Sequence, residues 1–401
     1  MAATAHRSVR DPATTPVVVA CCRTAIGRAH PERGAFRHVR GDELATAVVQ
    51  AVVERSGVDP HSIEDVVLGA TQQRGELGGN VARTVALMAG LPFATAGTTV
   101  NRLCGSSLQA LAQACHAIAA GAENVQVVGG VEHMHHLPME SAVDIHPKAF
   151  ARSSRGMLSM GLTAEHLAAA HGLSRRRQEE YAVASHRKAA RADDEGLFDD
   201  EIVRVPGHDE AGGLLEIIRD QSIRGDTSLE AMAALEPVFL PKLGTITAAT
   251  SAPISDGAAA MLVMSEQEAA RQGLAPLARV VASAVVGVPP AAMGTGPIAA
   301  TRKLLARVAA QGIALADVDL VELNEAFAAQ AIHCIDELGL DAERVNVRGG
   351  SLAIGHPLGA GGARIATTLL HAMRERGDRL GLATMCIGLG QGIAVLFERL
   401  E

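Results

Sequence analysis

Aromatic residues are scarce in this sequence of 401 residues, which contains no Trp and a single Tyr, Tyr181. Hydrophobic residues still make up 48% of the chain, so its core must consist mainly of small aliphatic side chains. Such side chains favour close contacts between helices and sheets. The chain also exceeds the size at which one hydrophobic core usually stops growing, which predicts two compact parts or a duplicated pair.

Long apolar runs and an excess of positive charge are missing as well. No uninterrupted apolar stretch is long enough to cross a bilayer, and residues 1–15 lack the apolar segment of a signal peptide. We therefore expect no membrane insertion and a flexible N-terminus over residues 1–15. The formal net charge of −8 argues against nucleic acid as a partner, because its phosphates require clustered Lys and Arg.

Cysteine is present but does not follow the pattern of a disulfide scaffold or of a CxxC metal site. Without such pairs the cysteines are expected to be reduced thiols in a cytoplasmic protein. The six positions are Cys21, Cys22, Cys104, Cys115, Cys334 and Cys386.

Hydrophobic periodicity predicts alternating strands and helices. β-branched or continuous apolar runs indicate strands, and apolar residues at helical spacing indicate helices. Alternation of this kind predicts a layered α/β sheet. The expected elements are strand Thr15–Cys22, helix Asp42–Arg55, strand Ile63–Gly69, helix Leu108–Ala120 and strand Val125–Gly129.

The same order recurs in the C-terminal part of the chain, which predicts an internal duplication. A helix at Thr301–Ala310 precedes three positions that repeat earlier ones at a constant spacing: Gly57, Ile63 and Leu68 correspond to Gly312, Val318 and Leu323. Helix Ala363–Arg376 and strand Leu380–Cys386 likewise repeat the helix and strand that follow Cys104.

Residues 134–250 interrupt this rhythm with Gly- and Pro-marked turns and a charged helix at Arg175–Glu195. Long excursions on a rigid scaffold usually shape ligand sites, so we expect an inserted loop domain that binds substrate. The predicted divisions are an N-terminal half at 16–133, the insertion at 134–250, a return to the N-terminal half at 251–276 and a C-terminal half at 277–401.

The segment Val100–Ser107 (VNRLCGSS) places Cys104 at a turn that enters a helix. The dipole and free N–H groups of a helix N-terminus favour a thiolate, so we expect a lowered pKa and a nucleophilic role for Cys104. A cysteine that merely fills a core is the common alternative. Cys115, on the apolar face of the same helix, fits that alternative.

Two further clusters could supply acid and base groups. In Arg348–Gly362 (RGGSLAIGHPLGAGG), glycines flank His356 just ahead of a helix, and imidazole is the usual base for a thiol near neutral pH. In Cys386–Gly390 (CIGLG), a cysteine ends an apolar strand at a Gly-rich turn. Either segment alone is also compatible with a structural loop.

Together with Asn324–Phe327 (NEAF), these segments resemble the four catalytic loops of the thiolase family, and the likeness covers residues 16–400. The resemblance implies the thiolase fold, in which two duplicated α/β halves form an αβαβα sandwich. It implies that Cys104 is the nucleophile, His356 its base and Cys386 the acid/base for carbon. A water held by Asn324 and the ring N–H of His356 would form one oxyanion hole, and the N–H groups of Cys104 and Gly388 the other.

The same resemblance implies that Arg224, Ser251, Ala252 and Met160 contact coenzyme A, a co-substrate, and that no cofactor is permanently bound. Ala252 departs from the family pattern, in which a serine usually touches the pantetheine arm. Two more departures, Arg348 and Ser351, lie beside the histidine loop, where Asn and Ala are commoner.

Zinc is an alternative for a set of two cysteines and one histidine, but metal ligands usually come in close pairs, and these three come singly from separate loops. The cluster His133, His135 and His136 is expected to be structural, because its surroundings resemble the thiolase entrance to the substrate loop. We therefore predict no metal site.

Gly156–Leu167 and Thr384–Arg399 look most like the thiolase subunit of bacterial fatty-acid oxidation complexes. The expected activity is cleavage of 3-oxoacyl-CoA by CoA, in a homodimer or homotetramer with a possible hydratase/dehydrogenase partner subunit. Biosynthetic condensation of acetyl-CoA, a decarboxylating ketosynthase and a non-catalytic CoA- or lipid-binding protein are the alternatives. A ketosynthase would pair its cysteine with two histidines or with His and Asn, whereas Cys386 stands at the acid/base position here.

Overall fold

The computed structural model of the chain describes residues 11–139, 141, 143–151 and 153–400. Residues 1–10 of the expected flexible N-terminus lie outside this range, and Asp11 and Thr14 close a turn ahead of the first strand. In the described ranges, no helix combines the length and the apolar character needed to traverse a lipid bilayer.

The N-terminal half contributes five main strands in the order β4-β3-β5-β9-β1. The strands predicted at 15–22, 63–69 and 125–129 and the helices at 42–55 and 108–120 are all present, with ends shifted by a few residues. The elements are β1 (Pro16–Thr24), β2 (Gly27–Arg28), α1 (Gly41–Ser56), β3 (Asp65–Gly69), α2 (Val81–Met88), β4 (Ala96–Val100), α3 (Ser106–Ala119), β5 (Val125–His133), β9 (Ser255–Ser265) and α7 (Glu266–Gln272).

The C-terminal half repeats this arrangement, which confirms the predicted duplication. Its strand order β11-β12-β13-β10 matches β3-β5-β9-β1, with a parallel first pair and antiparallel pairs after it. The edges of β1 and β10 pair and join the two halves into one sheet. The elements are β10 (Ala278–Gly287), α8 (Gly296–Val308), β11 (Leu320–Leu323), α9 (Ala328–Leu338), α10 (Ser351–Ile354), α11 (Leu358–Arg376), β12 (Leu380–Ile387) and β13 (Gln391–Arg399).

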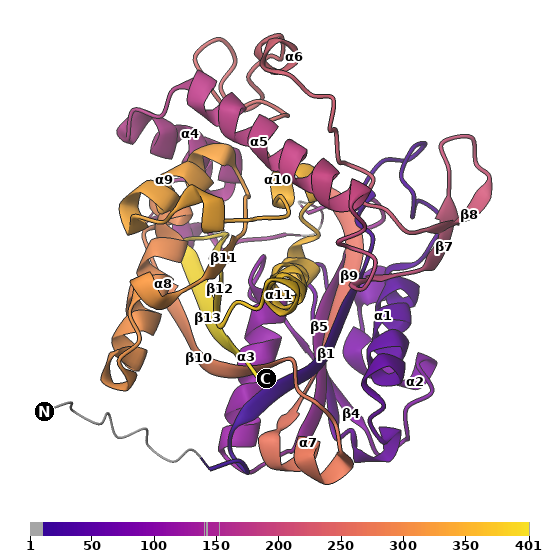
Figure 1. The fold of residues 1–401 in the computed structure, drawn as a ribbon. Coiled ribbons are helices and arrows are strands. Elements are labelled where there is room, and N and C mark those ends of the chain that lie inside the picture. Colours follow the sequence, from indigo (N-terminus) through magenta and orange to yellow (C-terminus); the bar gives the residue numbers. More distant parts are fainter. Residues whose placement is uncertain (1–10, 140, 142, 152, 401) are drawn as a thin grey trace, which may run out of the picture.

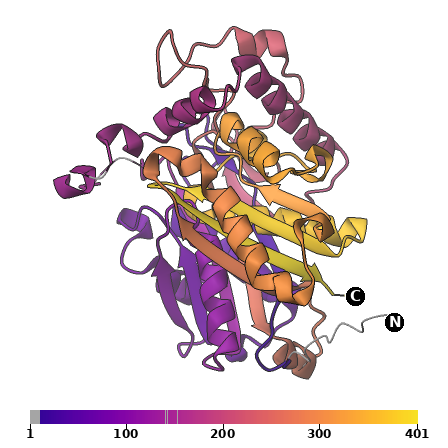
Figure 2. The same cartoon turned by 90° about the vertical axis from the view of Figure 1, so that its left-hand side faces the viewer.

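Helices and strands alternate in five layers, as the predicted αβαβα sandwich requires. Helices α3 and α11 pack against each other between the two halves of the sheet, and α11 contacts β5 and β9 on one side and β11 and β12 on the other. Helices α1 and α2 cover the outer face of the N-terminal half, and α8 and α9 that of the C-terminal half (Figure 1). Figure 2 shows the orange helices of the C-terminal half in front of its yellow strands.

The central layer is dense because its side chains are small. Every residue of α11 from Leu358 to Met373 is buried. At Gly362 a Cβ atom would lie 2.7 Å from Leu108 Cγ on α3, closer than side-chain carbons pack, so glycine is needed for the helices to touch. The small side chains that replace aromatic residues thus allow α3 and α11 to pack closely against each other.

The insertion lies between β5 and β9, at one end of the layers (Figure 1). In the C-terminal half, residues 388–390 alone make the equivalent connection between β12 and β13. The domain boundaries stay a prediction; those at 133 and 277 fall at the end of β5 and just before β10. The insertion contains α4 (Met160–Ala170), α5 (Arg175–Asp194), β6 (Ile202–Val203), β7 (Val205–His208), β8 (Leu214–Ile217) and α6 (Leu229–Ala233).

Candidate active site

Cys104 lies in a tight turn between β4 and α3. Leu103, directly before it, has a φ of +46°, a left-handed conformation that is uncommon for leucine. The turn is held by the Leu103 amide, which donates to Asn101 Oδ1 (2.8 Å), and by the Ser106 hydroxyl, which donates to the Leu103 carbonyl (2.6 Å). Only 5% of Cys104 is exposed, so the turn presents the thiol to a nearly closed site.

The environment of the Cys104 thiol differs from the sequence-based expectation of a lowered pKa. Burial raises the pKa of Cys104 to about 11, and the N–H group of Gly388, which donates to the sulfur, offsets only part of that rise. Helix α3 begins two residues later, at Ser106, so its N-terminus does not compensate for the lost hydration. The unliganded site therefore holds a neutral thiol that needs a base.

Cys386 comes from the end of β12 and interacts electrostatically with Cys104. It is 2% exposed, and its pKa is raised well above the usual value, first by burial and then by the neighbouring charge of Cys104. The turn of residues 388–390 that follows brings the Gly388 amide to the Cys104 sulfur. Leu389 in this turn has a φ of +61°.

His356 lies between α10 and α11, where its backbone N–H donates to Ser255 Oγ (3.1 Å). Burial, followed by the charge of Arg364, lowers the pKa of His356 to about 3, so the imidazole is neutral and can accept a proton. Its Nε2 lies 3.4 Å from Asn324 Nδ2. Within the described residues, His356 Nδ1 has no hydrogen-bond partner.

The segment after β11 supplies Asn324 and its supporting carboxylate, Glu325. The backbone N–H of Asn324 donates to the Thr384 carbonyl on β12 (3.0 Å). This bond places Asn324 at the same end of the sheet as Cys386. Glu325, 1% exposed, ties this segment to the insertion and to the histidine loop. Its carboxylate accepts hydrogen bonds from Tyr181, Ser185, Asn346 and the Leu352 amide.

Buried polar groups of the N-terminal half accept hydrogen bonds from the first turns of α11. Ser107 Oγ at the start of α3 accepts from the Ala363 amide in the first turns of α11 (2.8 Å). Glu132 on β5 accepts from the Gly359 amide (2.8 Å). The sequence did not reveal the supporting roles of Ser107, Glu132 and Ser255; the signal for Glu132 was a lone carboxylate in a fully buried strand.

The residues assigned to coenzyme A do not all gather at the catalytic loops. Met160, at the start of α4, approaches Gly388: a Cβ on that glycine would lie 3.9 Å from Met160 Sδ. Ala252 donates its amide N–H to the Ala326 carbonyl (3.0 Å), and Ser251 lies beside it. Arg224 is exposed on the insertion, where its backbone N–H donates to His186 Nδ1 (3.2 Å).

The described residues contain one group suited to a metal ion, formed by Glu76, His133 and His136. Its ring nitrogens already have protein partners: His136 contacts Glu76 Oε1 and the Arg37 carbonyl, both at 3.0 Å. His133 Nε2 contacts the Phe36 carbonyl at 3.1 Å, and the two rings stack with centroids 3.8 Å apart. These contacts support the predicted structural role.

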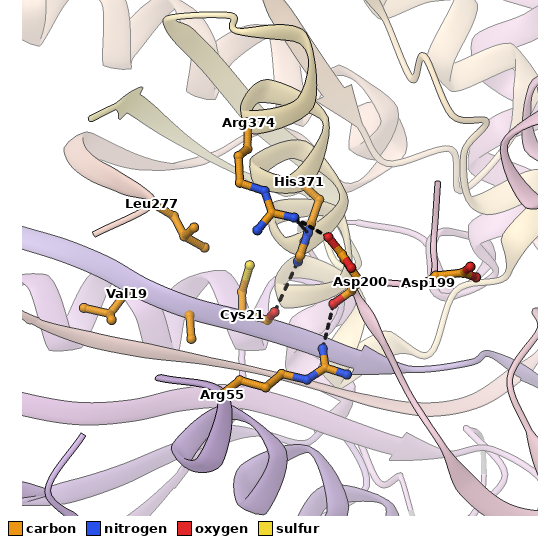
Figure 3. Close-up of a pocket in the computed structure, with 9 residues that line it drawn as sticks. Val19, Cys21, Arg55, Asp199, Asp200, Leu277, His371 and Arg374 are labelled. Atoms are coloured by element: carbon orange, nitrogen blue, oxygen red, sulfur yellow. Dashed lines mark hydrogen bonds and ion pairs between the residues drawn. The ribbon is translucent and has the colours of Figure 1, made fainter. Parts of the chain in front are cut away.

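A cavity of about 460 Å³ lies away from the catalytic residues, beside β1 and the C-terminal end of α11 (Figure 3). The two arginines that line this cavity already bind protein groups. Arg374 pairs with Asp200 Oδ2 at 2.6 Å, and Arg55 donates to the Asp200 carbonyl at 2.7 Å. The lining consists of Val19, Ala20, Cys21, Arg55, Asp199, Asp200, Leu277, His371 and Arg374.

The fold and the four converging loops agree with the family comparison. Residues 16–267 match the thiolase N-terminal domain, and residues 274–399 match the thiolase C-terminal domain. The chain belongs to the thiolase family and is an acyltransferase.

Known relatives match almost the full length. A 3-ketoacyl-CoA thiolase of Aliivibrio fischeri is 52% identical over 390 residues, which cover 96% of this chain and 99% of the relative. One of Shewanella loihica is 49% identical over 387 residues, with the same coverage of each chain.

Solved structures share the fold. The human mitochondrial 3-ketoacyl-CoA thiolase superposes with a TM-score of 0.88 at 33% identity and covers 97% of this chain and 100% of its own. The acetyl-CoA acetyltransferase of Bacillus anthracis gives 0.87 at 38% identity, with coverage of 96% and 99%.

Proposed function

We propose that the protein is a 3-oxoacyl-CoA thiolase that uses coenzyme A to cleave 3-oxoacyl-CoA into acetyl-CoA and a shortened acyl-CoA. The observation that carries this proposal is the hydrogen bond from the Gly388 amide to the Cys104 sulfur, together with the electrostatic interaction between Cys104 and Cys386. A nucleophilic thiol, a second thiol and an oxyanion donor thus share one closed site.

In the first half-reaction, His356 takes the proton of Cys104, and the sulfur attacks the C3 carbonyl of the substrate. The N–H groups of Cys104 and Gly388 stabilise the oxyanion that forms. When the C2–C3 bond breaks, negative charge moves to the thioester oxygen, which the Asn324-bound water and the new N–H of His356 stabilise. Cys386 then donates a proton to C2, and acetyl-CoA leaves.

In the second half-reaction, Cys386, now a thiolate, takes the proton of the incoming coenzyme A thiol. The coenzyme A sulfur attacks the acyl group on Cys104, and Cys104 departs with the proton that His356 held. Burial lowers the pKa of His356 and raises the pKa values of both thiols, so the cycle starts from a neutral imidazole and two neutral thiols.

Condensation of two acetyl-CoA molecules would use the same groups in reverse. The identity of 52% to a bacterial 3-ketoacyl-CoA thiolase over almost the full length favours thiolysis in fatty-acid β-oxidation and lipid degradation. A ketosynthase is disfavoured because a second thiol, Cys386, stands at the acid/base position and interacts electrostatically with Cys104. A non-catalytic relative is disfavoured because all four loops keep their reactive residues.

The proposal includes a homodimer or homotetramer in the cytoplasm, with an accompanying hydratase/dehydrogenase subunit. Strand β4 ends the sheet in the described structure, which leaves an edge that a second copy could extend. Arg224, Ser251, Ala252 and Met160 remain our proposed contacts of coenzyme A, and no cofactor is permanently bound.

The test is a thiolysis assay with free coenzyme A across 3-oxoacyl-CoA substrates of graded chain length. We expect coenzyme A-dependent loss of the 3-oxoacyl-CoA and formation of acetyl-CoA in equal amount. A protein that binds these thioesters but consumes none of them would contradict the proposal. Light scattering of the same sample checks the oligomeric state.

A further inference from the structure

A series of buried hydrogen bonds lies behind His356. The Arg364 guanidinium donates from Nη2 to Ser351 Oγ at 2.7 Å. Ser351 Oγ lies 2.7 Å from Asn324 Oδ1, and Asn324 Nδ2 faces His356 Nε2 at 3.4 Å. All four side chains are between 0% and 6% exposed, so protein partners set their orientations.

The available donors and acceptors fix the direction of each hydrogen bond in this series. A guanidinium has only donors, whereas a hydroxyl has a single proton and two lone pairs. Because Arg364 occupies a lone pair of Ser351, the hydroxyl proton can go to Asn324 Oδ1. The oxygen of the Asn324 amide is thereby engaged, and its NH₂ group is turned toward His356.

Arg364 has no strong competing partner. Its Nε and Nη1 lack hydrogen-bond partners among the described residues, and Glu322 Oε2 lies 4.0 Å from Nη1. Burial raises the pKa of Glu322 to about 8, so this carboxyl is mostly protonated at neutral pH. A buried cation bonded to the Ser351 oxygen polarises the hydroxyl and strengthens its bond to Asn324.

We propose that Ser351 is a positioning residue which, with Arg364 behind it, holds the Asn324 amide so that its NH₂ group faces His356 and binds the water that stabilises the thioester oxygen. The inference rests on the proposed function, because the thioester oxygen becomes negative only when the C2–C3 bond breaks. With the amide reversed, Asn324 Oδ1 would point toward His356, and the amide could no longer donate a hydrogen bond to the water that stabilises that oxygen.

Because carbon–carbon cleavage and acyl transfer use different oxyanion sites, a positioning role of Ser351 can be distinguished from a general effect on the fold. Acyl transfer from a simple acyl-CoA to Cys104 uses the Cys104 and Gly388 amides and does not create an enolate. Loss of the Ser351 hydroxyl should therefore slow carbon–carbon cleavage and leave acyl transfer and alkylation of Cys104 nearly unchanged.

The test compares Ser351→Ala with the matched pair Ser351→Thr and Ser351→Val, which differ in the hydroxyl alone. We expect kcat for cleavage to fall roughly 10- to 100-fold in the Ala and Val variants, part of the effect of removing one oxyanion donor, with KM little changed. Ser351→Thr should recover most of the rate. In an Asn324→Ala background, Ser351→Ala should have no further effect.

Equal losses in cleavage and acyl transfer, or an undiminished effect in the Asn324→Ala background, would overturn the proposal. If the Thr and Val variants fail to fold, Ser351→Ala and the double-mutant cycle with Asn324→Ala still test the proposal. Equal rates for folded Thr and Val variants would also contradict a role for the hydroxyl.

A readout independent of activity separates this inference from the proposed function. In the wild-type protein labelled with ¹⁵N-histidine, the His356 signal, assigned with His356→Gln, should report an unprotonated Nε2. Ser351→Ala should shift this Nε2 resonance, and an unchanged resonance would overturn the inference. A wild-type protein without thiolysis would overturn the proposed function alone.

Discussion

The two halves of the molecule share a strand order but differ at one connection. Between β5 and β9 the connection runs over residues 134–254 and includes the insertion, whereas between β12 and β13 the chain turns within residues 388–390. The long connection contributes Met160 beside the site, and the short one contributes the Gly388 amide. The duplicated scaffold places both connections at the same end of the layers, so divergence there changes chemistry and leaves the core intact.

Equivalent positions in the two halves also carry different chemistry. Cys104 stands directly ahead of α3, and His356 stands directly ahead of the equivalent α11. The sheet registers pair Leu68 with Gly129 and Leu323 with Thr384, which makes Val131 the counterpart of Cys386. In the proposed mechanism, one half therefore supplies the nucleophile, and the other supplies both proton-transfer groups.

The largest effect on activity is expected when the C-terminal half loses its base, His356. His356→Ala removes a proton acceptor and an oxyanion donor, so thiolysis should fall by more than roughly the 10²–10⁴ typical of general base catalysis. Alkylation of Cys104 by iodoacetamide should slow near neutral pH and then rise with pH toward the thiol pKa of about 11. Equal alkylation rates in wild type and variant at pH 7 would remove His356 as the base.

Replacing the other proton-transfer group should affect one step alone. Cys386→Ser should lower carbon–carbon cleavage by roughly 10²–10⁴, because the proton for C2 lacks its donor. Acyl-enzyme formation from a simple acyl-CoA and alkylation of Cys104 should stay near wild type. If the variant lost acylation and kept proton exchange at C2, the two roles would have to be exchanged.

A third prediction concerns the tie between the insertion and the N-terminal half. Arg23 pairs with Glu201 at 2.7 Å and with Asp220 at 2.7 Å, and all three side chains are 0% exposed. Arg23→Met leaves two buried carboxylates without their cation, so we expect a loss of about 3–5 kcal/mol in the free energy of unfolding, measured in urea. The exposed pair Arg176 and Glu180 supplies the control, since Arg176→Ala should leave the midpoint unchanged.

This ion pair also predicts the pH dependence of stability. Despite the opposing effect of burial, the charges of Arg23, His371 and Arg348 leave the pKa of Glu201 below its usual value. A lowered native pKa contributes stability above the unfolded pKa of about 4.3, and this contribution is lost as the pH falls through the lower native value. Unfolding free energies of wild type and Arg23→Met should converge at the acid end. A gap that widens with acid would contradict the assignment.

The smallest effect is expected in the short connection itself. Leu389 is 46% exposed and has a φ of +61°, a conformation that costs an ordinary residue roughly 1–2 kcal/mol. Leu389→Gly should therefore raise the unfolding free energy by up to about 1 kcal/mol, after the added entropy of the unfolded glycine. A thermal melt checks this, and a clear destabilisation would show that the Leu389 side chain makes contacts that outweigh the strain.

The sequence predicted the layers and the duplication because hydrophobic period and spacing are local properties. It also identified the catalytic candidates, whose motifs are short and contiguous. It did not predict the raised pKa of Cys104, because burial depends on how distant segments close over the turn. The supports provided by Ser255 to His356 and by Glu132 to Gly359 were missed for the same reason: each joins residues far apart in the chain.

The most direct test of the account is to locate the acyl group after mixing the enzyme with a simple acyl-CoA. We predict that mass spectrometry of the digested Cys386→Ser variant finds one acyl group on the peptide that contains Cys104. Cys104→Ala in the same background should carry none while it keeps the native fold. An acyl group on any other residue, or turnover by Cys104→Ala, would contradict the central claim.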